Sequence, residues 1–182
     1  MMRSLPPQSD PRVRPATPAD VAALCGLIGE LAAYENAGHE AQATPAQLQT
    51  ALFGAQPTIF AIVAADEPGG PVVGFALYFL NFSTWLGVNG LYLEDLYVQQ
   101  ERRGTGLGKA LLQTLARIAV ERGYGRVEWA VLKWNTPSIG FYESIGAVAQ
   151  DEWQTMRLAG PALARFGGGH AQPETADTAK EI

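Results

Sequence analysis

A glycine-rich turn between a strand and a helix is the feature that most limits how this chain can fold. Glycine occupies positions 104, 106 and 108, between an apolar stretch at 91–98 and an amphipathic segment at 106–122. Glycine adopts positive φ angles and lets the backbone approach a ligand closely. The helix that follows offers unpaired N–H groups and a favourable dipole to an anion. We therefore predict that this strand, turn and helix form a site for a phosphorylated ligand.

Helix and strand patterns mix along the rest of the chain. Apolar residues recur with helical spacing after the turn, at Leu107, Leu111, Leu115 and Ile118. Proline after Thr17 and after Thr44 marks two more helix starts, the first helix reaching about residue 34. A further helix begins near Thr136 and ends before Gly146. Strands are predicted at 12–14, 58–65, 72–80, 91–98 and 127–132, with Val148 and 153–158 supplying the last one. This order predicts an α/β domain with a mixed sheet.

Length and end composition suggest one domain. The chain has 182 residues, which is within the usual size of a single domain. Residues 1–11 carry three prolines and few apolar side chains, and residues 167–182 are mostly small and polar. We expect flexible segments at 1–11 and 167–182 around a domain at 12–166.

The counts of cysteine and histidine and the net charge argue against several classes of protein. Cys25 is the one cysteine and there are two histidines, so neither an internal disulfide nor a structural zinc site is expected, and no metal is predicted. A net charge of −5 argues against a nucleic-acid partner. The start of the chain resembles no signal peptide, and the apolar stretches are too short to span a bilayer. We expect a cytoplasmic protein with no membrane partner.

Two common glycine motifs do not fit the turn. A Walker A loop needs glycine at 103 and Ser or Thr after the lysine, where this chain has Arg103 and Ala110. A dinucleotide-binding fingerprint needs glycine at 109, which is Lys109. A purely structural turn stays open as an alternative when the segment is taken alone.

The turn does resemble one known family. Arg103-x-x-Gly106-x-Gly108, after a strand that ends in Glu94-Asp95-Leu96-Tyr97-Val98, is similar to the acyl-CoA motif of the GCN5-related N-acetyltransferases (GNAT). The segment 134–147 resembles the second cofactor segment of that family. The segments 14–17, 30–35 and 92–95 are similar to its diamine, or spermidine/spermine, branch. The resemblance covers about 12–158 and implies a mainly antiparallel sheet flanked by helices, with a splayed strand that binds acetyl-CoA.

The resemblance implies acetyl-CoA as co-substrate, held mainly by the backbone. A splayed or bulged strand at 96–98 would leave amide and carbonyl groups for the pantetheine arm, and the turn would hold the pyrophosphate. The implied cofactor-binding residues are Leu96, Tyr97, Val98, Arg103, Gly104, Thr105, Gly106, Leu107, Gly108, Lys109, Asn135, Ser138 and Tyr142. Helix capping is an equally good interpretation of Asn135.

Two residues are candidates for the proton transfers. An alkylamine with a pKa of about 10.4 loses its proton at pH 7 at a cost of about 4.6 kcal/mol, and a nearby carboxylate can accept that proton. Glu94 and Asp95 are adjacent on a strand, so we expect their side chains on opposite faces. The resemblance implies Glu94 as the base or ammonium anchor, Asp95 as a supporting acid, and Tyr142 as the acid that protonates the thiolate. A solvated Glu94 and a core-packing Tyr142 are the alternatives.

The acceptor site is implied by the resemblance alone. Carboxylates and aromatic rings that suit a cationic amine would come from Tyr34, Glu35, Trp85, Glu94, Glu152 and Trp153. Lys133 stands where the diamine branch usually has an acid, which disfavours a long polycation. The expected acceptor is a diamine, a polyamine or a lysine-like amino acid. An antibiotic or protein amine, or a non-catalytic CoA sensor, are the alternatives. The family also implies a homodimer, with exchange of strand material around 153–158.

Overall fold

The computed structural model describes residues 9–168. The chain divides into two compact units, the first ending at Leu132 and the second beginning at Lys133. Each unit is described by itself. The segments predicted to be flexible, 1–11 and 167–182, lie mostly outside the described residues. No helix among residues 9–168 is both long and apolar enough to cross a membrane.

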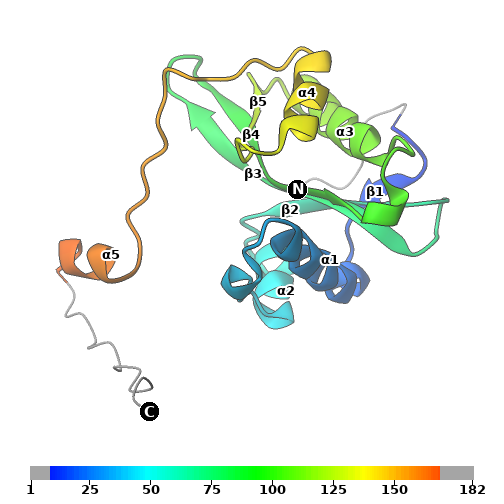
Figure 1. The fold of residues 1–182 in the computed structure, drawn as a ribbon, viewed down its shortest axis with the longest axis horizontal. Helices are drawn as coiled ribbons and strands as arrows, with labels where there is room; N and C mark the ends of the chain where they lie inside the picture. The colour runs from blue at the N-terminus through cyan, green and yellow to red at the C-terminus, as the bar shows by residue number, and fades with distance from the viewer. Residues whose placement is uncertain (1–8, 169–182) are drawn as a thin grey trace. The chain divides into compact units, whose positions relative to one another are not determined.

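The first unit is built on a five-stranded sheet (Figure 1). Its strands, in sheet order and in chain order alike, are β1 (Val13–Pro15), β2 (Phe60–Ala65), β3 (Val72–Ser83), β4 (Val88–Val98) and β5 (Val127–Trp129). Neighbouring strands are antiparallel except for β4 and β5, which are parallel. The predicted mixed and mainly antiparallel sheet is confirmed.

Two helices on one face of the sheet begin at the predicted caps. The 3-10 turn η1 (Pro18–Asp20) leads into α1 (Val21–Tyr34), and α2 (Pro45–Phe53) follows the 3-10 turn η2 (Gly38–Glu40). The Thr17 N–H donates to Asp20 Oδ2 at 2.7 Å, and the Gln47 N–H donates to Thr44 Oγ1 at 3.3 Å. The accepting side chains, Asp20 and Thr44, bind backbone N–H groups at the helix starts, where the helix itself provides no acceptor.

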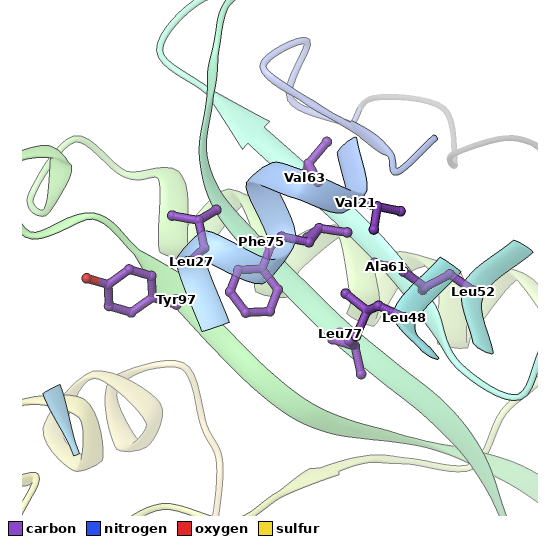
Figure 2. Close-up of a cluster of buried hydrophobic side chains, with 10 residues drawn as sticks. Val21, Leu27, Leu48, Leu52, Ala61, Val63, Phe75, Leu77 and Tyr97 are labelled. Atoms are coloured by element: carbon purple, nitrogen blue, oxygen red, sulfur yellow. The ribbon is translucent and has the colours of Figure 1, made fainter. Parts of the chain in front are cut away.

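The core between these helices and the sheet follows from the alternation of the strands. In a regular stretch of strand, every second side chain points to the same face of the sheet. The buried cluster contains Val21, Leu24, Leu27, Leu48 and Leu52 from the helices, and Ala61, Val63, Phe75, Leu77 and Tyr97 from the strands (Figure 2). This packing fixes the end of α1 close to the second half of β4.

The other face of the sheet is covered by α3 (Leu107–Glu121), which follows the short turn η3 (Gln100–Arg102) (Figure 1). The four apolar positions predicted for this helix, Leu107, Leu111, Leu115 and Ile118, are each at most 3 % exposed. The buried apolar face therefore anchors α3 on the sheet, and the helix begins immediately after the glycine-rich turn.

The second unit contains α4 (Thr136–Ser144) and α5 (Gly160–Phe166). The Asn135 side chain caps α4, and Gly146 follows its end with a φ of 89°, as predicted. Helix α5 was not predicted from the sequence pattern.

The predicted strand at Val148 and 153–158 is wrong for the described chain, because residues 147–159 form no strand there. A strand needs a partner for its backbone groups, and apolar side chains of this segment such as Trp153 and Met156 are 70 % and 83 % exposed. Strand β5 also ends at Trp129 instead of continuing to residue 132.

Candidate active site

Strand β4 contains a β-bulge at Glu94. Asp95 pairs with Leu77 of β3 and Leu93 pairs with Tyr78, so Glu94 is the additional residue. The sequence placed the bulge or splay at 96–98, but these three residues pair regularly with Gly74, Phe75 and Ala76. The bulge lies earlier because the change of register at Glu94 preserves the burial of apolar side chains on both sides of it.

The splay predicted for this strand is present on the side of β5. The parallel pairing of β4 with β5 covers only Leu91–Leu93. Within the described residues, the stretch of β4 from Glu94 to Val98 therefore has no strand neighbour on that side. Its outward backbone groups form an open edge that can bind an extended ligand through main-chain hydrogen bonds.

Three carboxylates are gathered at the bulge. Asp95 faces the side of the sheet that α1 covers, because its partner Leu77 belongs to that core. Burial raises the pKa of Asp95 to about 6, and the negative charges of Glu94 and Glu35 add to the shift. Burial also raises the pKa of Glu35 at the end of α1. The bulge removes the regular alternation on which we expected Glu94 and Asp95 to face opposite ways.

The glycine-rich turn has the predicted backbone conformation. Gly104 and Gly106 have φ angles of 80° and 86°, in the left-handed region that favours glycine. Gly106 is the N-cap of α3, and its carbonyl accepts from the Ala110 N–H at 2.9 Å. As in any helix, the N–H groups of the first turn have no acceptor one turn earlier. With the helix dipole, these donors suit a pyrophosphate.

The arginines around the turn are engaged with the protein. Arg102 forms an ion pair with Asp66 at 2.8 Å. Arg12 donates to the Thr105 carbonyl at 3.3 Å. Arg103 Nε donates to the Val98 carbonyl, also at 3.3 Å. These contacts join the turn to Asp66, Arg12 and the end of β4.

The predicted acceptor residues of the first unit are only partly brought together. Tyr34 and Glu35 end α1, where Glu35 joins the carboxylates of the bulge. Trp85 is 87 % exposed in the turn between β3 and β4. That turn begins after Ser83, about 16 Å along β3 from the bulge at Tyr78. The first unit does not bring Trp85 to the carboxylates.

The remaining predicted residues lie in the second unit. Tyr142 of α4 is half-buried, contacts the Phe141 ring with centroids 5.5 Å apart, and has a pKa raised by burial. Asn135 Oδ1 accepts from the Ser138 N–H at 3.4 Å, which confirms the capping interpretation. Other predicted or discussed residues of this unit are exposed, namely Lys133, Glu152 and Trp153.

From the sequence we expected Asp95 only as a supporting acid, and Arg12 was not among the predicted site residues. A signal for Asp95 exists in the apolar pattern of β4, in which Leu91 and Leu93 alternate and the pattern resumes one residue late at Leu96. Such a slip indicates a bulge. No comparable signal exists for Arg12, because its contact with Thr105 joins residues 93 positions apart.

Comparison with known proteins agrees with this geometry. The Acetyltransferase (GNAT) family model matches residues 29–147. This chain is a member of the GNAT acetyltransferase family. It is 35 % identical to a cattle (Bos taurus) thialysine N-epsilon-acetyltransferase, over 86 % of this chain and 96 % of that protein. It is 33 % identical to an Arabidopsis thaliana L-ornithine N5-acetyltransferase, over 84 % and 86 % of the two chains.

A solved structure has the same fold. An integron cassette protein from the mobile metagenome of V. cholerae superposes with a TM-score of 0.71 and 28 % identity, over 85 % of this chain and 96 % of that one. GNAT enzymes use acetyl-CoA as co-substrate. The protein is therefore an acetyltransferase that acts on amines, and its resemblance to the diamine branch is supported by the thialysine and ornithine enzymes.

Proposed function

We propose that this GNAT enzyme acetylates the primary amine of a small cationic acceptor, a diamine, a polyamine or, most closely, a lysine-like amino acid. The observation that carries the proposal is the group of three carboxylates, Glu35, Glu94 and Asp95, at the open edge of β4. Asp95 is half-buried, while Glu35 and Glu94 are exposed beside it. Negative charges placed so close together repel one another unless a cation joins them. A protonated amine supplies that cation before it loses its proton.

Acetyl-CoA supplies the acetyl group as an activated thioester. In the proposed complex, the N–H groups at the start of α3 hold the pyrophosphate, with Gly104 and Gly106 keeping the turn open. The open edge of β4 at Leu96, Tyr97 and Val98 holds the pantetheine arm. The turn residues from Arg103 to Lys109, together with Asn135, Ser138 and Tyr142, complete the predicted set.

Two residues handle the protons. Glu94 accepts the proton of the acceptor ammonium, directly or through water, from its position at the bulge. Asp95 and Glu35 add negative charge beside it and hold the cation. Tyr142 donates a proton to the thiolate that leaves, and its raised pKa keeps the phenol protonated at neutral pH.

A lysine-like acceptor fits both the relatives and one residue of this chain. The thialysine and ornithine enzymes act on amino acids that carry a side-chain amine. Lys133 is exposed at the start of the second unit. Its positive charge suits an acceptor that carries a carboxylate better than a long polycation.

We further propose that residues 12–166 act as one catalytic domain and that two copies form a homodimer. The family match runs from residue 29 to residue 147 and so spans both units. Trp153, Met156 and Leu158 are 70 %, 83 % and 50 % exposed. Apolar side chains in such a run favour burial against a partner, and strand exchange around 153–158 would bury them. Gel filtration with light scattering measures the state directly.

The function is tested by thiol release from acetyl-CoA across a panel of amines. The panel contains thialysine, lysine, ornithine, short diamines, spermidine, tyramine and an aminoglycoside. We expect the highest kcat/KM with thialysine, lysine or ornithine. Equal or higher rates with tyramine or the aminoglycoside would contradict the proposal, as would binding of acetyl-CoA without turnover of any small amine.

A further inference from the structure

The exposed side chain of Arg103 lies over the rings of two tyrosines. Its guanidinium carbon is 4.4 Å from the centre of the Tyr34 ring and 5.7 Å from the centre of the Tyr97 ring. Its Nε donates to the Val98 carbonyl at 3.3 Å, and its backbone N–H donates to the Gln100 carbonyl at 3.3 Å. Arg103 is thus bound by the protein at both its backbone and its side chain.

A second contact joins the same two regions. Gln99 Nε2 donates to Glu30 Oε1 at 3.1 Å. Burial and the nearby negative charge of Glu30 raise the pKa of Tyr97. Glu30 and Tyr34 are one helical turn apart on α1, so they lie on the same side of that helix. The last turn of α1 is therefore joined to the end of β4 by a polar contact and a stacking contact.

The chemistry of arginine explains why stacking holds this position. The guanidinium is planar and weakly hydrated, so it lies on aromatic rings while still donating a hydrogen bond. Arg103 immediately precedes Gly104, where the backbone turns into the left-handed region. Fixing the Arg103 side chain therefore also fixes the direction in which the chain enters the glycine-rich turn.

We propose that Arg103 is a positioning residue that fastens the glycine-rich turn to the acceptor-side end of α1 by stacking between Tyr34 and Tyr97. The inference rests on the proposed function only in taking the turn as the site for the pyrophosphate of acetyl-CoA. It assigns to Tyr34, whose ring contacts the Arg103 guanidinium, an effect on acetyl-CoA binding.

The test is calorimetric titration of the full chain with acetyl-CoA, without an amine. Replacing Tyr34 by leucine removes the ring, whereas Tyr34→Phe keeps it. We expect Tyr34→Leu to weaken acetyl-CoA binding about 5–10-fold and Tyr34→Phe to change it less than about 2-fold. Arg103→Met should weaken binding to a similar degree, and the double variant should bind no more weakly than the worse single one.

Tyr92→Leu is the matched control. Like Tyr34, Tyr92 is half-buried, but it belongs to β4 and lies on the other side of the bulge. Its ring contacts the Phe79 ring, with centroids 5.0 Å apart. We expect this variant to lose stability without a loss of acetyl-CoA affinity above about 2-fold. Additive effects of Tyr34→Leu and Arg103→Met, or unchanged affinity in Tyr34→Leu, would overturn the inference.

A second measurement uses the free protein and needs no ligand. It keeps the inference testable if a variant folds too poorly for titration with acetyl-CoA. Amide hydrogen exchange at Ala110, whose N–H donates to the Gly106 carbonyl of the turn at 2.9 Å, should be about 10-fold faster in Arg103→Met than in wild type, and unchanged in Tyr92→Leu. Equal exchange in Arg103→Met and wild type would overturn the inference. If the wild-type protein itself failed to bind acetyl-CoA, the proposed function would fail instead, and the exchange result would still decide the role of Arg103.

Discussion

Asp95 pairs with Leu77 across the β3–β4 ladder, one residue out of the register that holds on the other side of the bulge. This shift places a carboxylate on the face covered by α1, next to Glu35 and Glu94. A regular strand would have kept the alternation of one buried and one exposed residue. The bulge is therefore the local feature that brings Asp95 together with Glu35 and Glu94.

The first prediction concerns the stability cost of Asp95. Its pKa in the folded protein is raised from 3.8 to about 6, so the folded state binds the proton more tightly than the unfolded state between these values. The free energy of unfolding of wild type should fall, relative to Asp95→Asn, as the pH rises from about 4 to about 6. At pH 7 we expect Asp95→Asn to be more stable by about 1–2 kcal/mol, because solvent screening reduces the full effect.

Urea unfolding of both proteins at pH 4, 5, 6 and 7 measures this difference. Asp151→Asn is the control, since Asp151 is exposed in the second unit. A stability difference between Asp95→Asn and wild type that stays constant across this range would show that Asp95 titrates normally.

The second prediction separates Glu94 from acetyl-CoA binding. Glu94→Gln keeps the size of the side chain but cannot accept a proton, so kcat/KM for the amine should fall about 10²-fold or more. The Kd of acetyl-CoA, measured by calorimetry, should change less than about 2-fold. If Glu94→Gln were fully active while Asp95→Asn lost activity, the base would be Asp95 and the assignment made above would be wrong.

The third prediction concerns Tyr142 as the proton donor. Tyr142→Phe removes the hydroxyl and keeps the ring that contacts Phe141, so kcat should fall about 10²-fold with little change in stability. Since burial raises the pKa of Tyr142, wild-type activity should show no loss below pH 10 from ionisation of this group. Rates of Tyr142→Phe equal to wild type would remove Tyr142 from the reaction.

The fourth prediction concerns the conformation of the turn. Gly106 has a φ of 86° at the start of α3, and valine is strongly disfavoured there because its branched side chain clashes with the backbone. Gly106→Val should lower acetyl-CoA affinity at least about 10-fold. Gly29→Ala, in α1 where an added Cβ meets nothing within 4 Å, should leave that affinity unchanged. Equal affinities of the two variants would contradict the role of the turn.

Much of the fold follows from local signals in the sequence. Thr17 and Thr44 mark helix starts because their caps use residues three positions away. The apolar spacing of α3 predicts its buried face, and the spacing of Gly104 and Gly106 predicts their φ angles. In each case the interaction lies within a few residues of the chain, so a single sequence contains it.

Other features depend on partners far along the chain or outside it. The Arg103–Tyr34 stack joins residues that only the packing of α1 on β4 brings together. The strand expected at 153–158 needs an edge to pair with, and these residues form no strand in the described chain. Glu94 was recognised from the family motif, but the position of the bulge depends on the register with Leu77 and Tyr78.

The most direct test of the account compares two amines of similar length in one enzyme and its variants. The two substrates are butylamine and either ornithine or thialysine. The kcat/KM of each is measured by thiol release for wild type, Glu35→Gln and Asp95→Asn. We expect wild type to prefer the amino acid at least about 10²-fold. Each variant should lose about 10-fold in kcat/KM with either amine, because Glu35 and Asp95 hold the ammonium that both amines carry. Unchanged kcat/KM with both amines in both variants would mean that the carboxylates at the bulge do not hold the acceptor.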